Sequence, residues 1–138
     1  MGVAAHTILI VEDNNDIRLL FTAVFTLCGM NVLATRTLRD ACRAFEAGVQ
    51  IDAIMVDYTL PDGVGPNILT LLGDKLPKVR VLVTGHDITH PGFSECFTKP
   101  VDMGLLCRSV RSGLEKVYHA TSEASGTCGQ VGQGVLRP

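Results

Sequence analysis

The chain has 138 residues, of which 46% are hydrophobic, 5% aromatic and 19% charged, a composition typical of one compact soluble domain and not of a disordered or fibrous chain. Its formal net charge of −2 comes from 12 Lys and Arg against 14 Asp and Glu. A basic excess that would drive binding to nucleic-acid phosphates is therefore excluded, and we expect no direct DNA binding.

The first predicted elements are a strand and a helix. Thr7–Val11 is a short run rich in Ile and Val without polar alternation, as expected for a buried parallel strand. Asn14, Asn15 and Asp16 are suited to cap a following helix, and Gly29 is suited to end it. Between them, apolar residues recur at helical spacing (Ile17, Leu20, Phe21, Val24, Phe25 and Cys28).

A second strand, a second helix and a third strand follow. The strands are predicted over Asn31–Thr35 and Ala53–Asp57, the second of which is again a continuous apolar run. Thr37, with Asp40 three residues later, indicates the start of a helix that ends near Gly48. The apolar face of this helix is formed by Leu38, Ala41, Cys42 and Phe45.

The same alternation continues to the last predicted helix. Pro66 suits the first turn of a short helix through Leu72, and Val79–Thr84 and residues 96–98 are the remaining predicted strands. The last helix carries an apolar stripe of Met103, Leu106, Cys107, Val110, Leu114 and Val117. Repeated strand–helix units predict an α/β fold with a doubly wound, five-stranded parallel sheet.

One connection is short for this fold. Only the twelve residues 84–95, which include Pro91 and Gly92, lie between Val83 and the last predicted strand. A complete parallel crossover needs about a dozen residues or more. The fourth helix is therefore expected to be shortened or absent. We expect residues 1–117 to form the domain and residues 118–138, rich in Ser, Thr, Gly and Gln, to form a flexible polar tail. Such a tail is too short to be a DNA-binding domain, so the chain is either a stand-alone module or a piece of a larger protein.

The cysteines and the amino-terminal segment bear on the compartment. The apolar stretch of residues 8–11 is too short for a signal peptide or a membrane span, and acidic residues follow it. The five cysteines are an odd number without a Cys-x-x-Cys pair (Cys28, Cys42, Cys96, Cys107 and Cys128). We expect reduced thiols with packing roles, a cytoplasmic protein and no membrane partner.

Polar side chains follow four predicted strands at the points where the strands end. Glu12 and Asp13 follow the first strand, whereas Asp57, Thr84 and Lys99 lie at the ends of the third, fourth and fifth. Ligands of open α/β sheets bind at this edge. Three carboxylates meeting there call for a hard cation such as magnesium, and a hydroxyl and an ammonium group suit phosphoryl oxygens.

In these residues the chain resembles the response-regulator receiver family (CheY-like) of two-component signalling, from Thr7 to about Val117. Each motif is weak alone, but their order and spacing are those of the family. The shared motifs are the acidic pair Glu12-Asp13, Asp57, the loop Leu60-Pro61-Asp62-Gly63, the hydroxyl of Thr84 and Thr98-Lys99-Pro100. The resemblance implies the flavodoxin-like receiver fold.

The resemblance also implies a phosphoryl-transfer site. Asp57 would accept a phosphoryl group from a sensor histidine kinase, a phosphotransfer protein or a small acyl phosphate. Magnesium would be held by Asp13, Asp57 and the backbone carbonyl of Thr59, with Glu12 acting largely through water. Lys99 would pair with Asp57 or with a phosphoryl oxygen. Such a module catalyses its own phosphorylation and dephosphorylation and does not turn over external substrates.

Two departures from the family concern the output of the signal. Thr84 would bind the phosphoryl group and shift the loop after it, but Cys96 stands where the family usually carries a Tyr or Phe that changes rotamer. We assign Thr84 and Cys96 to the switch and expect an unusual route to an unknown downstream protein. The short connection leads to the hypothesis that apolar surface near the last strand and last helix binds a partner or forms a homodimer.

Simpler interpretations exist for single residues. Glu12 and Asp13 alone would favour a helix amino terminus, and residues 60–63 alone would be an ordinary turn. His86 and His90 invite a transition-metal site, but two His in a polar loop are usually solvent-facing. Thr59 and His86 are expected to influence the lifetime of the phosphoryl group.

Two other functions compete with phosphorylation. The first is an interaction module of the same fold without phosphorylation, against which the complete set of polar strand ends argues. The second is an aspartate-nucleophile phosphohydrolase of the haloacid-dehalogenase type. Such enzymes place a second Asp two residues after the nucleophile as general acid, and here that position is Thr59.

Overall fold

The computed structural model describes residues 5–126, and for residues 118–126 the backbone alone. A five-stranded parallel sheet with strand order β2-β1-β3-β6-β7 forms its centre. The strands are β1 (Thr7–Val11), β2 (Asn31–Thr35), β3 (Ala53–Asp57), β6 (Val79–Thr84) and β7 (Glu95–Thr98). The predicted fold class is therefore confirmed.

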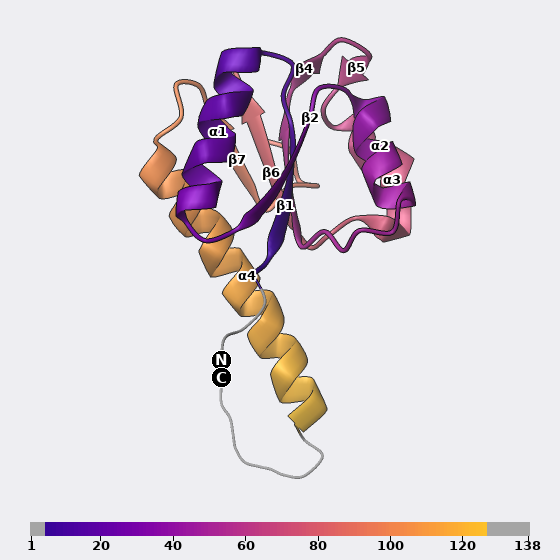
Figure 1. Ribbon diagram of the computed structural model, residues 1–138, viewed down its shortest axis with the longest axis vertical. Coiled ribbons are helices and arrows are strands. Elements are labelled where there is room, and N and C mark those ends of the chain that lie inside the picture. The colour runs from indigo at the N-terminus through magenta and orange to yellow at the C-terminus, as the bar shows by residue number, and fades with distance from the viewer. Residues whose placement is uncertain (1–4, 127–138) are drawn as a thin grey trace.

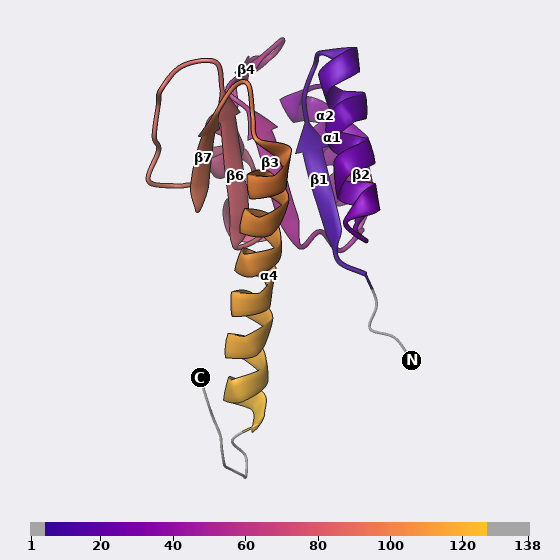
Figure 2. The ribbon, with the colours of Figure 1, turned by 90° about the vertical axis from the view of Figure 1, so that its left-hand side faces the viewer.

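Helices cover both faces of this sheet. Helices α1 (Asn15–Leu27) and α4 (Met103–Gly126) pack on one face, and α2 (Leu38–Glu46) and α3 (Asn67–Leu72) lie on the other (Figures 1 and 2). A 3-10 turn, η1 (Gly73–Lys75), follows α3. None of the described helices is long and apolar enough to cross a membrane.

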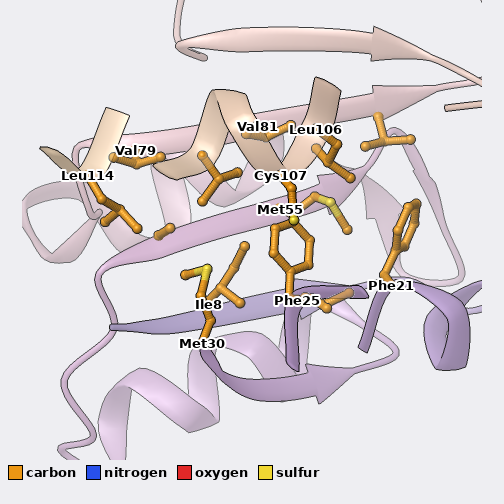
Figure 3. Packing of buried hydrophobic residues seen from close by; sticks show 14 residues of the cluster. Ile8, Phe21, Phe25, Met30, Met55, Val79, Val81, Leu106, Cys107 and Leu114 are labelled. Atoms are coloured by element: carbon orange, nitrogen blue, oxygen red, sulfur yellow. The ribbon is translucent and has the colours of Figure 1, made fainter. Parts of the chain in front are cut away.

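The core consists of two clusters because successive side chains of a strand point to opposite faces. Ile8 and Ile10 of β1 pack with α1 and α4, and Figure 3 shows Phe21 and Phe25 of α1 filling this layer. Leu9 and Val11 pack in the other layer with α2 and α3. All five residues of β3 are buried, as expected for a central parallel strand. The rigid sheet fixes where its strand ends lie.

Side chains predicted to cap the first two helices do so. The Asn14 carboxamide oxygen accepts a hydrogen bond of 3.0 Å from the backbone N–H of Ile17, and the Thr37 hydroxyl accepts one of 3.0 Å from Asp40. Each bond satisfies a donor that the first turn of a helix leaves unpaired. The start of α1 and that of α2 thus each have a local cap that the sequence predicts.

No helix forms in residues 85–94, all of which the structure describes, and this agrees with the prediction that the fourth helix is shortened or absent. In this segment the side chain of Phe93 is buried in the core cluster of α2 and α3. Arg80 donates to the carbonyl of Gly92 at 3.2 Å, and the Ser94 hydroxyl donates to the carbonyl of Arg80 at 2.7 Å. One aromatic ring and a few hydrogen bonds hold the short connection.

The last helix is longer than predicted. The backbone of α4 remains helical to Gly126, beyond Val117, where the apolar stripe ends. Residues 118–125 contain no Gly or Pro that would stop a helix, so propensity alone allows the extension. Residues 127–138 of the predicted flexible tail lie outside the described residues.

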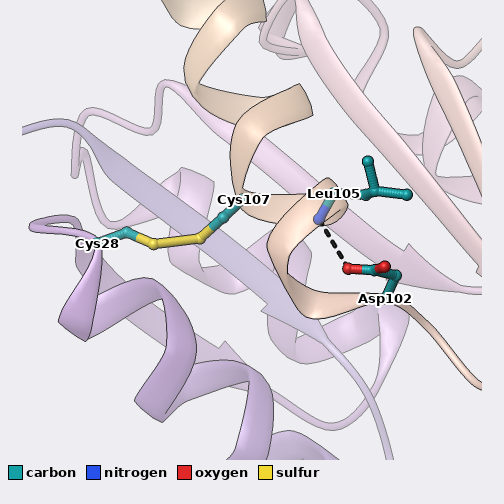
Figure 4. Close-up of a disulfide and its surroundings, with 4 residues drawn as sticks. All are labelled: Cys28, Asp102, Leu105 and Cys107. Carbon is teal, nitrogen blue, oxygen red and sulfur yellow. Dashed lines mark hydrogen bonds between the residues drawn. A yellow bond between two sulfur atoms is a disulfide. The ribbon is translucent and has the colours of Figure 1, made fainter.

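A disulfide joins Cys28, at the end of α1, to Cys107 in α4 (Figure 4). The expectation of reduced thiols with packing roles is thus wrong for this pair. Cys42 and Cys96 are free and half-buried, whereas Cys128 lies outside the described residues. The pairing could not be read from sequence because it depends on how α1 and α4 meet across 79 positions.

Candidate functional site

Three carboxylates meet at the carboxyl edge of the sheet. Glu12 and Asp13 follow β1, and Asp57 is the last residue of the neighbouring strand β3. One carboxylate oxygen from each lies within 4.8 Å of the other two. Glu12 is 1% and Asp57 8% exposed, although apolar strands surround both. Two buried carboxylates and a third beside them are costly unless cations compensate their charge.

Lys99 supplies one compensating charge. It follows β7, and its Nζ lies 3.2 Å from Glu12 Oε1 and 3.2 Å from Asp57 Oδ1. The ammonium group therefore bridges the ends of β1 and β3 from the far strand of the sheet. The structure thus brings Lys99 next to the acidic residues, as the sequence predicted.

The pKa values of these groups follow from burial and from their mutual charges. Burial is the main cause that raises the pKa of Asp57 above its usual value; Lys99 opposes this rise and Asp13 adds to it. Burial likewise raises the pKa of Glu12, with a further contribution from Asp57. Burial alone would lower the pKa of Lys99, but the Asp57 and Glu12 carboxylates outweigh it and raise that pKa. A further cation is needed to hold all three carboxylates ionised at low cost.

The donor set fits a hard divalent cation. Carboxylate oxygens are the ligands that magnesium and calcium prefer, and no soft or imidazole ligand belongs to this group among the described residues. The hypothesis of a transition-metal site with His ligands gains no support from these residues. The Nδ1 of His90 accepts a hydrogen bond from the N–H of Gly92, and its ring lies against Phe93. Glu12, Asp13 and Asp57 are thus a group that could hold a metal ion.

Thr84 ends β6 beside Asp57, which pairs with Val83 in the register of the sheet. Its side chain is fully buried, and its hydroxyl accepts a hydrogen bond of 3.1 Å from the backbone N–H of His86. Its carbonyl accepts one of 2.8 Å from the N–H of Lys99. The hydroxyl is therefore bonded to the first residues of the helix-free connection. Cys96, the other proposed switch residue, is half-buried in β7 opposite Leu82.

A small hairpin follows Asp57. Strands β4 (Thr59–Leu60) and β5 (Gly63–Val64) pair around the two-residue turn formed by Pro61 and Asp62. The sequence predicted only a turn in this segment. After the hairpin, the N–H of Gly65 donates to the Tyr58 carbonyl at 2.7 Å. A Cβ at Gly65 would overlap the backbone carbonyl of Asp57, so only glycine allows this close approach.

Two residues near the site, Asp62 and Arg18, were given no role from the sequence. The Asp62 carboxylate accepts hydrogen bonds of 3.0 Å from the backbone N–H groups of Leu38 and Arg39. Burial has the largest single effect on the pKa of Asp62 and raises it, but these hydrogen bonds, together with its own backbone N–H and the charge of Arg39, outweigh burial and lower that pKa. The Arg18 guanidinium donates to the Glu12 carbonyl at 3.0 Å. Asp62 sits in a Pro-Asp-Gly turn, but nothing local indicates that its partners lie 24 positions away.

The sequence pattern of the response regulator receiver domain matches residues 8–111. Among similar proteins are the response regulator protein PilR of Pseudomonas aeruginosa, 29% identical over 114 residues (77% of this chain, 25% of PilR), and the regulatory protein LuxO of Vibrio parahaemolyticus, 25% identical over 134 residues (91% of this chain, 29% of LuxO). A cyclic di-GMP phosphodiesterase of Thermotoga maritima is 29% identical over 122 residues (82% of this chain, 32% of that protein). The chain thus spans about a quarter to a third of these relatives.

Solved structures show the same fold. The signal receiver domain of an HD domain-containing protein from Pseudomonas fluorescens Pf-5 superposes with a TM-score of 0.77 at 20% identity, covering 88% of this chain and 96% of that one. The receiver domain of the Francisella response regulator 1452 gives a TM-score of 0.74 at 18% identity, covering 81% of this chain and 98% of that one.

Proposed function

Because the chain belongs to the response regulator receiver domain family of two-component systems, we propose that Asp57 accepts a phosphoryl group and that the chain thereby switches the binding of a partner. The observation that carries this proposal is a buried aspartate at a strand end, with Lys99 at 3.2 Å and two further acidic residues around it. The raised pKa of Asp57 fits a carboxylate that is stabilised when a cation is bound.

In the proposed reaction, a carboxylate oxygen of Asp57 attacks the phosphorus of a phosphohistidine or of a small acyl phosphate. An O–P bond to Asp57 forms, and the P–N bond of the histidine or the P–O bond of the acyl phosphate breaks with its electron pair leaving on that donor. The Lys99 ammonium is positioned to neutralise charge on the transferred oxygens. The Thr84 hydroxyl lies next to the same edge and is suited to donate to one of them.

We propose magnesium as the cation, held by Asp13, Asp57 and the backbone carbonyl of Thr59, with Glu12 acting through water. When bound, the ion would supply charge neutralisation at the phosphoryl oxygens. The chain's own part is to hold the carboxylates together: the rigid ends of β1 and β3 fix Glu12 and Asp57, and Arg18 donates to the carbonyl of Glu12. Lys99 keeps the two buried acids from repelling each other in the absence of metal.

The proposed donor is a sensor histidine kinase or a phosphotransfer protein, and the proposed location is the cytoplasm, where such donors present their phosphohistidine. The chain would catalyse only its own phosphorylation and dephosphorylation. Thr84 and Cys96 are proposed to pass the change to a downstream protein. With Cys96 in β7 and no helix in residues 85–94, that route differs from a rotamer change of an aromatic ring.

The experiment is incubation of the protein with acetyl phosphate and magnesium, followed by intact mass. We expect one phosphoryl adduct on the wild type, none on Asp57→Ala and none when a chelator removes the metal. Asp16→Ala, which alters an exposed carboxylate of α1, is the matched control and should react like wild type. A chain that gains no adduct from acetyl phosphate or from a panel of phosphorylated kinases would instead be an interaction module without phosphorylation.

A further inference from the structure

Asp62 ties the loop after Asp57 to a helix that belongs to an earlier part of the chain. It lies at the tip of the β4–β5 hairpin, and its two carboxylate oxygens accept separate hydrogen bonds of 3.0 Å from the first two N–H groups of α2, those of Leu38 and Arg39. Amino-terminal N–H groups of a helix have no partner within the helix, so a carboxylate is a strong acceptor for them. The hairpin tip lies beside this end of α2 in Figure 1.

The residue whose carbonyl is proposed as a metal ligand lies in the same hairpin. Thr59, whose carbonyl is proposed as a ligand, pairs with Val64 at the base of the hairpin, three positions before Asp62. The base is held by Gly65, which contacts the Asp57 backbone, and the tip is held by Asp62. A two-strand ribbon of two residues each is too short to be rigid by itself. The direction of the Thr59 carbonyl therefore depends on both attachments.

The amino terminus of α2 has a second, independent cap. The Thr37 hydroxyl accepts from the N–H of Asp40 and does not involve the hairpin. Loss of Thr37 or of Asp62 would each weaken the same helix end, but only loss of Asp62 would release the hairpin. Comparing variants of these two residues therefore distinguishes an effect on the stability of α2 from an effect on the position of the hairpin.

We propose that Asp62 is a positioning residue for the phosphorylation site: it orients the Thr59 carbonyl through the hairpin and couples the amino terminus of α2 to the occupancy of the acidic group. The inference rests on the proposed function. It adds α2 to the surfaces that sense the state of Asp57, on the side of the sheet opposite α1 and α4.

The first test compares magnesium affinity by isothermal titration calorimetry in wild type, Asp62→Ala, Asp62→Asn and Thr37→Ala, each with its thermal unfolding midpoint. We expect Asp62→Ala to bind magnesium about tenfold more weakly, the effect of an outer-shell partner. Asp62→Asn keeps one acceptor oxygen and should recover part of this loss. Thr37→Ala should lower the unfolding midpoint and leave the affinity unchanged. Wild-type affinity in Asp62→Ala, or an equal loss of affinity in Thr37→Ala, would overturn the inference.

The second test needs no variant and so does not depend on Asp62→Ala folding. Magnesium is titrated into the labelled wild type, and backbone N–H resonances are followed by NMR. Those of Leu38 and Arg39 should shift along the same binding curve as that of Tyr58, while that of Ala47, at the other end of α2, stays in place. If the Tyr58 resonance shifts while those of Leu38 and Arg39 stay in place, the inference about Asp62 is overturned but the proposed metal site is not. A wild type that binds no magnesium would overturn the proposed metal site itself.

Discussion

Asp57 is held in an environment that disfavours its charge when no metal is bound. Its pKa is raised mainly by burial, and Asp13 adds to the effect although Lys99 opposes it. Above both the folded and the unfolded pKa, the ionised carboxylate therefore reduces the free energy of unfolding. The proposed cation binding and phosphoryl transfer at Asp57 would thus come at a cost in stability.

The sign of the resulting pH dependence can be tested with Asp57→Asn in a chelator. The variant lacks the ionisation, so at pH 7 it should be more stable than wild type by on the order of 1 kcal/mol in urea unfolding. Its advantage should shrink as the pH falls through the raised pKa and vanish below the usual value of 3.8, because Asp57 is then protonated in both states. A variant that is less stable than wild type at pH 7 would contradict the raised pKa.

Lys99 should matter for stability as well as for phosphorylation. Lys99→Met leaves Glu12 and Asp57 without their cation, and we expect a loss of about 2 kcal/mol in the free energy of unfolding without metal, less than for a fully buried pair because Lys99 is partly exposed. Urea unfolding measures it. Lys78→Met, at an exposed position, is the control and should change little. Equal stabilities of the two variants would argue against the bridging geometry.

The charged residues of the site could be predicted because each lies at or just after the end of a strand, and parallel strands end at one edge of a sheet. Glu12, Asp57 and Lys99 are thus brought together by topology alone. Asp62 and Arg18 could not be predicted in this way. Their partners are backbone N–H and carbonyl groups, which every residue carries and which leave no signature in the sequence.

At the scale of elements, the connection between β6 and β7 shows how a receiver domain does without a helix. Phe93 is buried in the core cluster of α2 and α3, to which Leu82 and Ile68 also belong. Hydrogen bonds of Arg80 and Ser94 also hold this segment. The shortened connection could be predicted from the number of residues between the two strands. The role of Phe93 could not, because it depends on the packing of the whole core layer.

Phe93→Ala should therefore be one of the more damaging substitutions outside the central strands. Removal of a buried ring leaves a cavity that the surrounding residues cannot close completely, and we expect a loss of about 3 kcal/mol in the free energy of unfolding. Thr89→Ala, exposed in the same segment, should change it by less than about 0.5 kcal/mol. If both variants unfold at the same denaturant concentration as wild type, Phe93 does not anchor the connection.

The disulfide between α1 and α4 closes a long loop, because Cys28 and Cys107 are 79 positions apart in the sequence. Restriction of the unfolded chain by a loop of this length predicts a stabilisation of about 4 kcal/mol. Addition of a reductant should lower the free energy of unfolding of wild type by about this amount and leave Cys28→Ala unaffected. Cys42→Ala, which removes a free cysteine, should respond to the reductant like wild type. An insensitive wild type would show that the two sulfurs are not bonded in solution.

Element boundaries were predictable where a local signal exists, as at the caps Asn14 and Thr37. They were not predictable where the structure depends on distant partners. The β4–β5 hairpin is held at its tip by α2, and the Cys28–Cys107 bond depends on the packing of α1 on α4. The end of α4 was placed too early because the apolar stripe stops before the helix does.

On the scale of the whole molecule, the hypothesis of a homodimer through the surface near β7 and α4 stays a prediction. Leu105, 49% exposed near the start of α4, is a large apolar side chain on that surface. Light scattering after size exclusion should give a mass that rises with concentration in wild type and not in Leu105→Glu. A strict monomer at every concentration, with and without a phosphoryl mimic, would remove the hypothesis.

The central claim is that Asp57, and no other carboxylate of the acidic group, receives the phosphoryl group. The most direct measurement is to treat the acetyl phosphate adduct with borohydride, which reduces an aspartyl phosphate to homoserine, and to map the modified residue by peptide mass spectrometry. We predict homoserine at position 57 alone, formed only with magnesium present. Homoserine at position 13 or 62 in the wild type, or none at position 57 after the adduct has formed, would contradict the account.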